Sequence, residues 1–226
     1  MPKNKAEKVY KFAVIASDIV IFTVDQGSLK TLLIQMKKAP FEGHWAAPGG
    51  LVDPAESVDF AAARILKEKT GLTNIYLEQL YTFGKVDRDP FGRVVSVGYF
   101  ALISKEGIDL KTTAEYRDVA WFDVKRLPKL AYDHQEIIET ALKRLKSKLE
   151  YTNIIYTLLP KEFTFGEMQK IYEIILGRRL DKRNFRKKIL SLNLVKKLGK
   201  KRAGEANRPA QLFSFIDHKL KEVEII

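Results

Sequence analysis

The chain has 226 residues, of which 46% are hydrophobic, and it contains no cysteine. The missing cysteines exclude disulfide bonds, thiolate metal ligands and cysteine nucleophiles, and they favour a reducing compartment. This length and apolar content suffice for one large or two modest domains with hydrophobic cores.

The net charge of +12 is distributed unevenly. Residues 1–150 carry 23 Lys and Arg against 20 Asp and Glu, whereas residues 151–226 carry 17 against 8, a balance of +9. Such an asymmetry indicates that the C-terminal third has a polyanionic partner. A lysine-rich composition with solvated surfaces is the alternative explanation.

No segment has the character of a signal peptide or a membrane span. The N-terminal lysines precede an apolar run, but Asp18 interrupts this run and no small-residue cleavage pattern follows. No stretch approaches the roughly 18 uninterrupted apolar residues of a spanning helix. We therefore expect a soluble, cytoplasmic protein that does not enter a membrane.

Strand and turn patterns dominate residues 1–148, the first of two expected domains. They predict strands at 11–24, 29–38, 76–86, 93–104 and 119–128, and helices at about 57–70 and 133–149. Ser57 suits the N-cap of the first helix, and Gly71 suits its C-terminal end. An α/β fold with helices on a mixed sheet accommodates this order of elements.

Residues 149–226 form the second expected domain. Apolar residues recur at helical spacing in residues 163–177 and 182–192, with Thr164 and Asp181 as candidate N-caps and Gly177 as a terminator. A hairpin with a basic tip follows in residues 194–215. Helix, turn, helix and hairpin are the elements of a winged helix-turn-helix, in the order in which that domain has them.

Residues 50–72 resemble the Nudix box, whose pattern is G, five residues, E, seven residues, then R-E-U-x-E-E-x-G-U, where U is a bulky aliphatic residue. The matching residues are Gly50, Glu56, Arg64, Leu66, Glu68, Gly71 and Leu72. The resemblance implies a Nudix-type α/β/α sandwich with a mixed sheet. Such a fold presents this loop and helix to a diphosphate that is linked to another group.

Two glutamates of the family pattern are missing. Ile65 and Lys69 stand where the family has glutamates that bind Mg²⁺ and help to activate water, and only Glu68 remains. Mg²⁺ prefers carboxylate ligands, and loss of a general base alone costs about 10²–10⁴-fold in rate. We therefore expect no catalytic residue, no metal site and no required cofactor. The retained Glu56 and Arg64 are expected to tie the loop to the helix by a charge-assisted pair.

Nearly the whole chain is similar to the Nudix-related transcriptional regulators. The phrases specific to that group are TFGKVDRDPFGRVVSVGYFALI, YDHQEII, LDKRNFRKKIL and an RPA that precedes an aromatic strand. The resemblance implies a degenerate Nudix domain that senses a metabolite and a C-terminal winged helix-turn-helix that binds operator DNA. Because a sensor must bind its signal without destroying it, the missing glutamates suit this function.

The resemblance also implies partners. Members of the group sense ADP-ribose or a pentose such as arabinose, so either is an expected effector. The regulators resemble dimers that contact two DNA half-sites, and we therefore expect a homodimer on double-stranded DNA.

Ten residues are expected to contact DNA. Arg183 and Asn184 begin the second helix of the motif, where arginine can bind guanine and asparagine can bind adenine. Neighbouring cations are expected to contact phosphates. The full set is Lys182, Arg183, Asn184, Arg186, Lys187 and Lys188 on the helix, with Lys200, Lys201, Arg202 and Arg208 on the wing, which is the hairpin of residues 194–215. Solvated surface charges, and for Asn184 a structural bond in the helix turn, are the alternatives.

Eight residues are candidates for the effector site. Arg88, Asp89 and Arg93 bracket the DRDPFG loop, and arginines suit phosphates or carboxylates, although they can also merely hold the loop. Trp45 suits stacking on a base or a sugar, but a place in the core is the favoured interpretation. The remaining candidates are Gly49, Gly50, Arg64 and Glu68.

Two other functions stay open. An active Mg²⁺-dependent Nudix hydrolase of the ADP-ribose pyrophosphatase type, with an accessory basic domain, would release AMP and would depend on Glu68. An RNA-binding or protein-interaction module is the third possibility, and a preference for RNA over duplex DNA would favour it.

Overall fold

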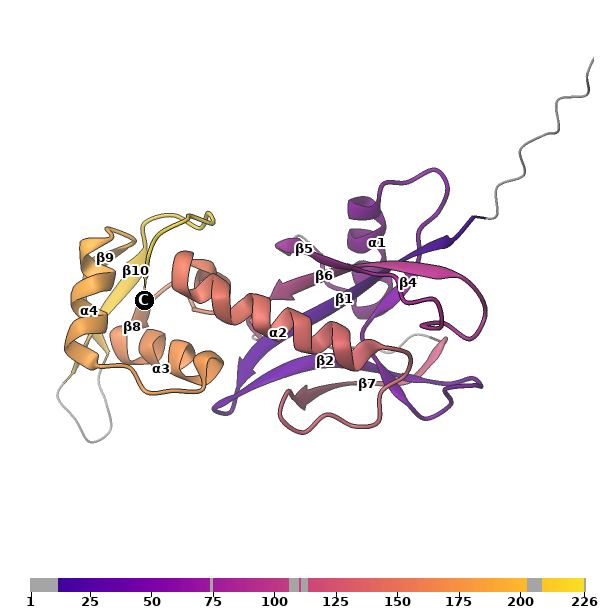
Figure 1. Cartoon of the computed structure of the whole chain (residues 1–226). Helices are drawn as coiled ribbons and strands as arrows, with labels where there is room; N and C mark the ends of the chain where they lie inside the picture. The colour runs from indigo at the N-terminus through magenta and orange to yellow at the C-terminus, as the bar shows by residue number, and fades with distance from the viewer. Residues whose placement is uncertain (1–11, 74, 106–109, 111–113, 203–208, 226) are drawn as a thin grey trace, which may run out of the picture.

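The computed structural model describes residues 12–73, 75–105, 110, 114–202 and 209–225 of the chain. These residues form an N-terminal α/β unit and a C-terminal unit of short helices and a hairpin (Figure 1). Across the described ranges, no helix is long and apolar enough to span a bilayer.

A mixed sheet, seven-stranded in the described residues, forms the centre of the first unit. Its elements are β1 (Val14–Asp25), β2 (Ser28–Met36), β3 (Trp45–Ala46), β4 (Gly49–Leu51), α1 (Val58–Thr70), β5 (Leu77–Phe83), β6 (Val94–Leu102), β7 (Tyr116–Asp123) and α2 (His134–Tyr151). The strand order is β3-β2-β1-β6-β5, with β4 paired to β1 and β7 paired to β2. The pair of β1 and β6 is parallel, and the other pairs are antiparallel.

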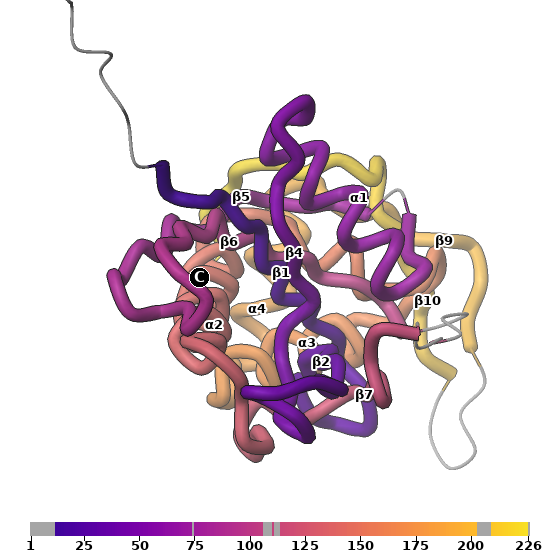
Figure 2. The backbone as a smooth tube through the Cα atoms, turned by 90° about the vertical axis from the view of Figure 1, so that its right-hand side faces the viewer, coloured from indigo at the N-terminus to yellow at the C-terminus, as the bar shows by residue number. Residues whose placement is uncertain are grey.

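Helices cover both faces of this sheet. Successive residues of a strand face opposite sides, so Ile19 and Ile21 of β1 pack in the cluster beneath α1, while Val20 and Phe22 pack in the cluster beneath α2. Figure 2 shows β1 in the middle of the sheet, with α1 and α2 on opposite sides of it. Burial on both faces explains why this strand is almost continuously apolar. The predicted α/β/α sandwich is confirmed.

The second unit is a winged helix. Its elements are η1 (Ile154–Thr157), β8 (Phe163–Thr164), α3 (Phe165–Leu176), α4 (Lys182–Ser191), β9 (Val195–Arg202) and β10 (Ala210–Phe215). Thr164 and Glu167 form a capping box at the start of α3, and Gly177 ends the helix with a φ of 73°. Asp181 caps α4. The predicted order of helix, turn, helix and hairpin is confirmed.

The two units share one hydrophobic core. Its buried residues run from Leu149 of α2 through η1 into α3, α4 and the hairpin. The C-terminal segment returns to this junction, since the Val223 N–H donates to the Tyr151 carbonyl at 2.8 Å and Ile225 is 2% exposed. The domain division predicted from the sequence, 1–148 and 149–226, falls in the last turn of α2 and stays a prediction.

Candidate functional site

A cavity of about 460 Å³ opens beside the strand pair of β1 and β4. Ligand pockets are typically about 300–1,000 Å³, so this one suits a small metabolite. Five of the eight predicted effector residues line it: Gly49, Gly50, Arg88, Asp89 and Arg93. The aromatic part of the lining was not predicted from the sequence; it comes from Phe91, Tyr116 and Tyr132.

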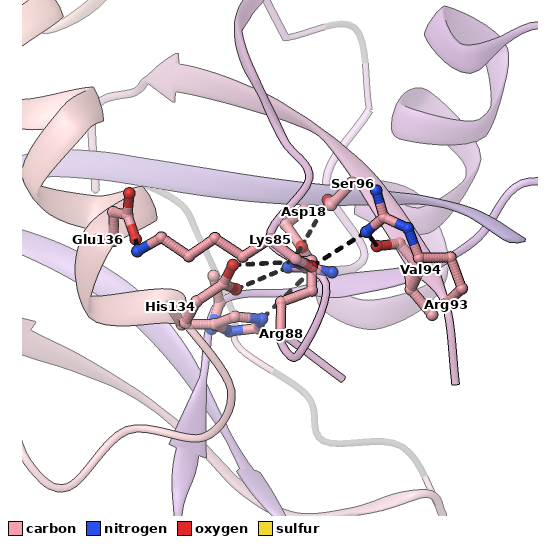
Figure 3. Close-up of polar contacts among 10 residues, drawn as sticks. Asp18, Lys85, Arg88, Arg93, Val94, Ser96, His134 and Glu136 are labelled. Carbon is pink, nitrogen blue, oxygen red and sulfur yellow. Dashed lines mark hydrogen bonds and ion pairs between the residues drawn. The ribbon is translucent and has the colours of Figure 1, made fainter. Parts of the chain in front are cut away.

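A buried ionic network forms the floor of the cavity (Figure 3). The Arg88 guanidinium donates to both carboxylate oxygens of Asp133, at 2.9 and 2.7 Å, and to Asp18 at 3.0 Å. Ser96 donates to the same oxygen of Asp18 at 2.6 Å. Burial alone would lower the pKa of Arg88, but its hydrogen bonds to Asp133 and the nearby Asp18 charge raise it. Arg88 therefore links its loop to β1 and to the start of α2.

His134 completes this floor as a neutral imidazole. Its Nδ1 accepts a hydrogen bond from the Ala47 N–H at 2.9 Å, so the ring proton resides on Nε2, which lies 3.6 Å from an Asp18 oxygen. Complete burial lowers the pKa of His134, and the charges of Asp18 and Asp133 only partly oppose this shift. His134 was not among the residues predicted for the effector site.

Arg93 and Asp89 lie at the rim of the cavity. One Arg93 nitrogen, Nη1, donates to the carbonyl oxygens of Gly84 at 2.9 Å and Lys85 at 3.1 Å. The Asp89 carboxylate accepts from the Phe91 N–H at 2.8 Å. Both side chains shape the loop and at the same time line the cavity.

Three predicted effector residues lie outside the lining. Trp45 packs on Phe122 against the main core, with ring centroids 4.5 Å apart. Arg64 makes the expected bidentate pair with Glu56, at 2.5 and 3.0 Å, and also contacts Glu68 at 3.1 Å. The Glu56–Arg64 tie between loop and helix is confirmed.

The two replaced positions of the box have structural contacts. Ile65 is 1% exposed and lies in the cluster between α1 and the sheet, next to Gly50. Lys69 donates to Glu115 and lies 5.0 Å from the ring centroid of Tyr116. Within the part of the chain that the structure describes, no group of three His, Cys, Asp or Glu side chains could hold a metal ion.

A second candidate surface is the exposed side of α4. Phe185 and Ile189 are buried in the core, and the opposite face carries the charges. The predicted residues exposed on this helix are Lys182, Arg183, Asn184, Arg186 and Lys187. Lys188 is partly buried and lies 3.5 Å from Glu224.

Neighbouring contacts hold several of these cations in place. The Arg186 guanidinium lies 4.8 Å from the ring centroid of Phe165. On the wing, Lys200 pairs with Glu162 at 2.8 Å and Arg202 pairs with Glu167 at 2.5 Å. Lys201 is exposed, and the predicted contact at Arg208 lies outside the described residues. Two exposed lysines of β9 were not predicted, Lys196 and Lys197.

The comparisons with known proteins agree with this architecture. The NUDIX domain model matches residues 14–141, and the model of the NrtR DNA-binding winged helix domain matches residues 155–215. A Nudix fold joined to this winged helix defines the class of Nudix-related transcriptional regulators. Within that class, the chain belongs to the NrtR family.

Three relatives are particularly similar. The ADPR responsive transcriptional repressor NtrR of Acinetobacter baylyi is 38% identical over 91% of this chain and 83% of its own. The ADP-ribose pyrophosphatase of Methanocaldococcus jannaschii is 35% identical over 62% of this chain and 79% of its own. Shewanella oneidensis NrtR, solved with a 27mer DNA, is 36% identical with a TM-score of 0.78, covering 89% of this chain and 93% of that one. Its NUDIX domain, solved with ADP ribose, is 39% identical with a TM-score of 0.55, covering 63% and 94%.

Proposed function

We propose that the chain is a transcriptional repressor that binds operator DNA through α4 and the wing and senses ADP-ribose in the Nudix cavity. The observation that carries this proposal is the combination, in one chain, of a ligand cavity beside a degenerate box and an exposed basic helix. The names of the relatives support it, since one is an ADPR responsive repressor and another was solved with DNA and with ADP ribose.

The first turn of α4 suits base recognition. Asp181 accepts from the Asn184 N–H at 2.8 Å, so the helix begins at a defined residue with Lys182, Arg183 and Asn184 exposed. The backbone bond leaves the Asn184 amide side chain available for a base edge. Arg186 and Lys187, further along the same face, suit phosphates.

The cavity favours ADP-ribose over a free pentose. Its volume of about 460 Å³ is larger than a single sugar requires, and Phe91, Tyr116 and Tyr132 offer aromatic surface for a base. Arg93 suits a phosphate. Arg88 is already engaged by two carboxylates, and we assign it to the support of the site rather than to the ligand.

The experiment that tests DNA recognition is a selection of duplex DNA from a random pool by the purified protein at near-physiological salt. An enriched inverted repeat is the expected result, because a dimer matches two half-sites. A pool without enrichment, or RNA that competes better than duplex DNA, would remove the operator-binding proposal.

A hydrolase is the second candidate, because one relative is an ADP-ribose pyrophosphatase. We propose instead that the protein requires no cofactor and does not turn over its effector. Of the three glutamates that follow the arginine in the family pattern, only Glu68 is present. Its carboxylate pairs with Arg64. AMP release from ADP-ribose in Mg²⁺, abolished by Glu68→Gln, would establish the hydrolase.

We further propose a cytoplasmic homodimer. At the open end of the β1–β4 strand pair, Val14 and Ile15 of β1 and Leu51 of β4 are 47%, 46% and 58% exposed, with Val14 and Leu51 on one face of the sheet and Ile15 on the other. Such an apolar patch suits a second copy of the chain. Sedimentation of the wild-type protein should give twice the chain mass, and Ile15→Lys should shift it toward the monomer. A wild-type monomer at micromolar concentration would contradict the dimer.

A further inference from the structure

A second large cavity lies between the two units. Its volume is about 520 Å³, and its walls come from the β1–β2 turn, the turn after β7, the middle of α2, and α3 with the turn that follows it. In Figure 1 the β1–β2 turn approaches the end of α3, on the side of α3 away from α4. The lining of this cavity shares no residue with the Nudix cavity and includes none of α4 or the wing.

Cations dominate the polar part of this lining. They are Lys125, Lys146, Lys170, Arg178 and Arg179, against two carboxylates, Asp123 and Glu173. Within the described residues, Arg179 is paired with Glu173 at 3.7 Å, and the other four cations have no acidic partner. Lys146 is one of these four although it is partly buried.

Both carboxylates also accept hydrogen bonds from neighbouring groups. Asp123 accepts a hydrogen bond from the Lys125 N–H at 2.8 Å. Glu173 accepts from the Leu180 N–H at 2.9 Å and from Gln169 at 3.0 Å. Like charges that converge on one concave surface repel one another and concentrate a positive potential. An anion bound there would relieve this repulsion.

The apolar part of the lining limits the kind of anion. Leu29, Val124, Leu142 and Ile174 form walls that a bare inorganic ion would leave uncovered. A base or sugar on apolar walls, with its phosphates among the lysines, matches both features and fits the volume. We propose that this interdomain cavity binds a nucleoside di- or triphosphate, as a ligand site separate from the Nudix cavity.

Such a ligand would join the two units. Lys125 and Lys146 belong to the α/β unit, whereas Lys170 and Arg178 belong to the winged helix. A phosphate chain that contacts both pairs would stabilise one relative orientation of the units. By linkage, a nucleotide bound there would change the affinity of the protein for DNA. This consequence rests on the proposed function, whereas the binding itself does not.

The test is calorimetric titration of the full chain with ATP, in metal-free buffer of fixed ionic strength, with and without saturating ADP-ribose. ATP should bind in both conditions. The double variant Lys146→Gln, Lys170→Gln should bind it at least about tenfold more weakly, since two charge-assisted contacts are lost. The matched control Lys143→Gln, Lys161→Gln removes two exposed lysines outside the cavity and should change the affinity less than about twofold.

Several results would overturn the proposal. These are absence of ATP binding, equal loss in both double variants, or displacement of ATP by ADP-ribose. If inorganic triphosphate binds as tightly as ATP, the cavity recognises only a polyphosphate chain, and the proposal of a nucleotide site is wrong. A double variant with weaker DNA binding in the absence of nucleotide would show that these lysines contact DNA. Equal melting temperatures of the two double variants verify that both are folded. If ATP binds as expected but ADP-ribose has no effect on the protein, only the proposed function is contradicted.

Discussion

Asp18 organises the floor of the Nudix cavity. It accepts from Arg88 and Ser96 and faces the imidazole of His134. A Cβ at Gly49 would collide with its carboxylate, so any other residue at this position would displace Asp18. Asp18 and Arg88 are 70 positions apart, and no local pattern predicts that they meet. The signal that was visible is a charged residue in an otherwise apolar strand, which indicates a buried partner.

Asp18→Asn should therefore destabilise the fold. It removes one of the two carboxylates that balance Arg88 in a buried site, and breaking such a pair costs about 3–5 kcal/mol. Urea denaturation measures the change, and Asp87→Asn, at an exposed aspartate next to Arg88, is the control. Equal free energies of unfolding for the two variants would contradict the role assigned to Asp18.

His134 should make the stability pH-dependent. Burial lowers its pKa in the folded state, so below about pH 6.5 the unfolded chain binds a proton that the folded chain does not. The stabilising contribution is complete above that pH and is lost as the pH falls, by at most about 1.4 kcal/mol per pH unit.

Thermal denaturation between pH 7.5 and 5.5 checks this. His134→Gln keeps an acceptor for the Ala47 N–H but does not titrate, so its melting temperature should fall less over that range. Parallel curves for the wild type and the variant would show that other groups control the acid sensitivity.

At the scale of elements, local signals predict some segments and not others. The helix α3 was predictable because its N-cap, its apolar stripe and its terminating glycine lie within the segment itself. The strands β3 and β4 have two and three residues and were not predicted. They exist through pairing with β2 and β1, and such long-range pairing leaves no periodicity in so short a segment.

The helix α4 separates base recognition from phosphate contact. Arg183→Ala should weaken binding to the selected operator by about 1–3 kcal/mol and relax the choice of one base pair. Lys187→Ala should weaken binding to all duplexes similarly and reduce the slope of log K against log salt by about one. Fluorescence anisotropy over a salt series measures both effects, with Lys143→Ala as a control outside the motif. Indistinguishable behaviour of Arg183→Ala and Lys187→Ala would contradict this division.

At the scale of the molecule, the continuous core between the units predicts cooperative unfolding. Both tryptophans lie in the α/β unit, so their fluorescence reports on that unit. Ile225 is buried at the junction, and Ile225→Ala should cost about 2–5 kcal/mol and lower the fluorescence midpoint as well as that of circular dichroism. Ile216→Ala, at a half-exposed position, is the control. A fluorescence midpoint that does not change would show that the units unfold independently.

The sequence predicted the order of the two units, the degenerate box and the basic face of α4, because each is encoded in contiguous residues. The ionic floor of the Nudix cavity and the shared core depend on contacts between distant segments. The same applies to the interdomain cavity, since its cations come from α2, α3 and two separate turns.

In the proposed function, ADP-ribose in the Nudix cavity changes the affinity of the winged helix for its operator. The most direct measurement is anisotropy of labelled operator DNA, titrated with the protein at fixed salt, with and without saturating ADP-ribose. We expect ADP-ribose to change the DNA dissociation constant by about 5–150-fold. An unchanged dissociation constant, with ADP-ribose shown by calorimetry to be bound, would contradict it.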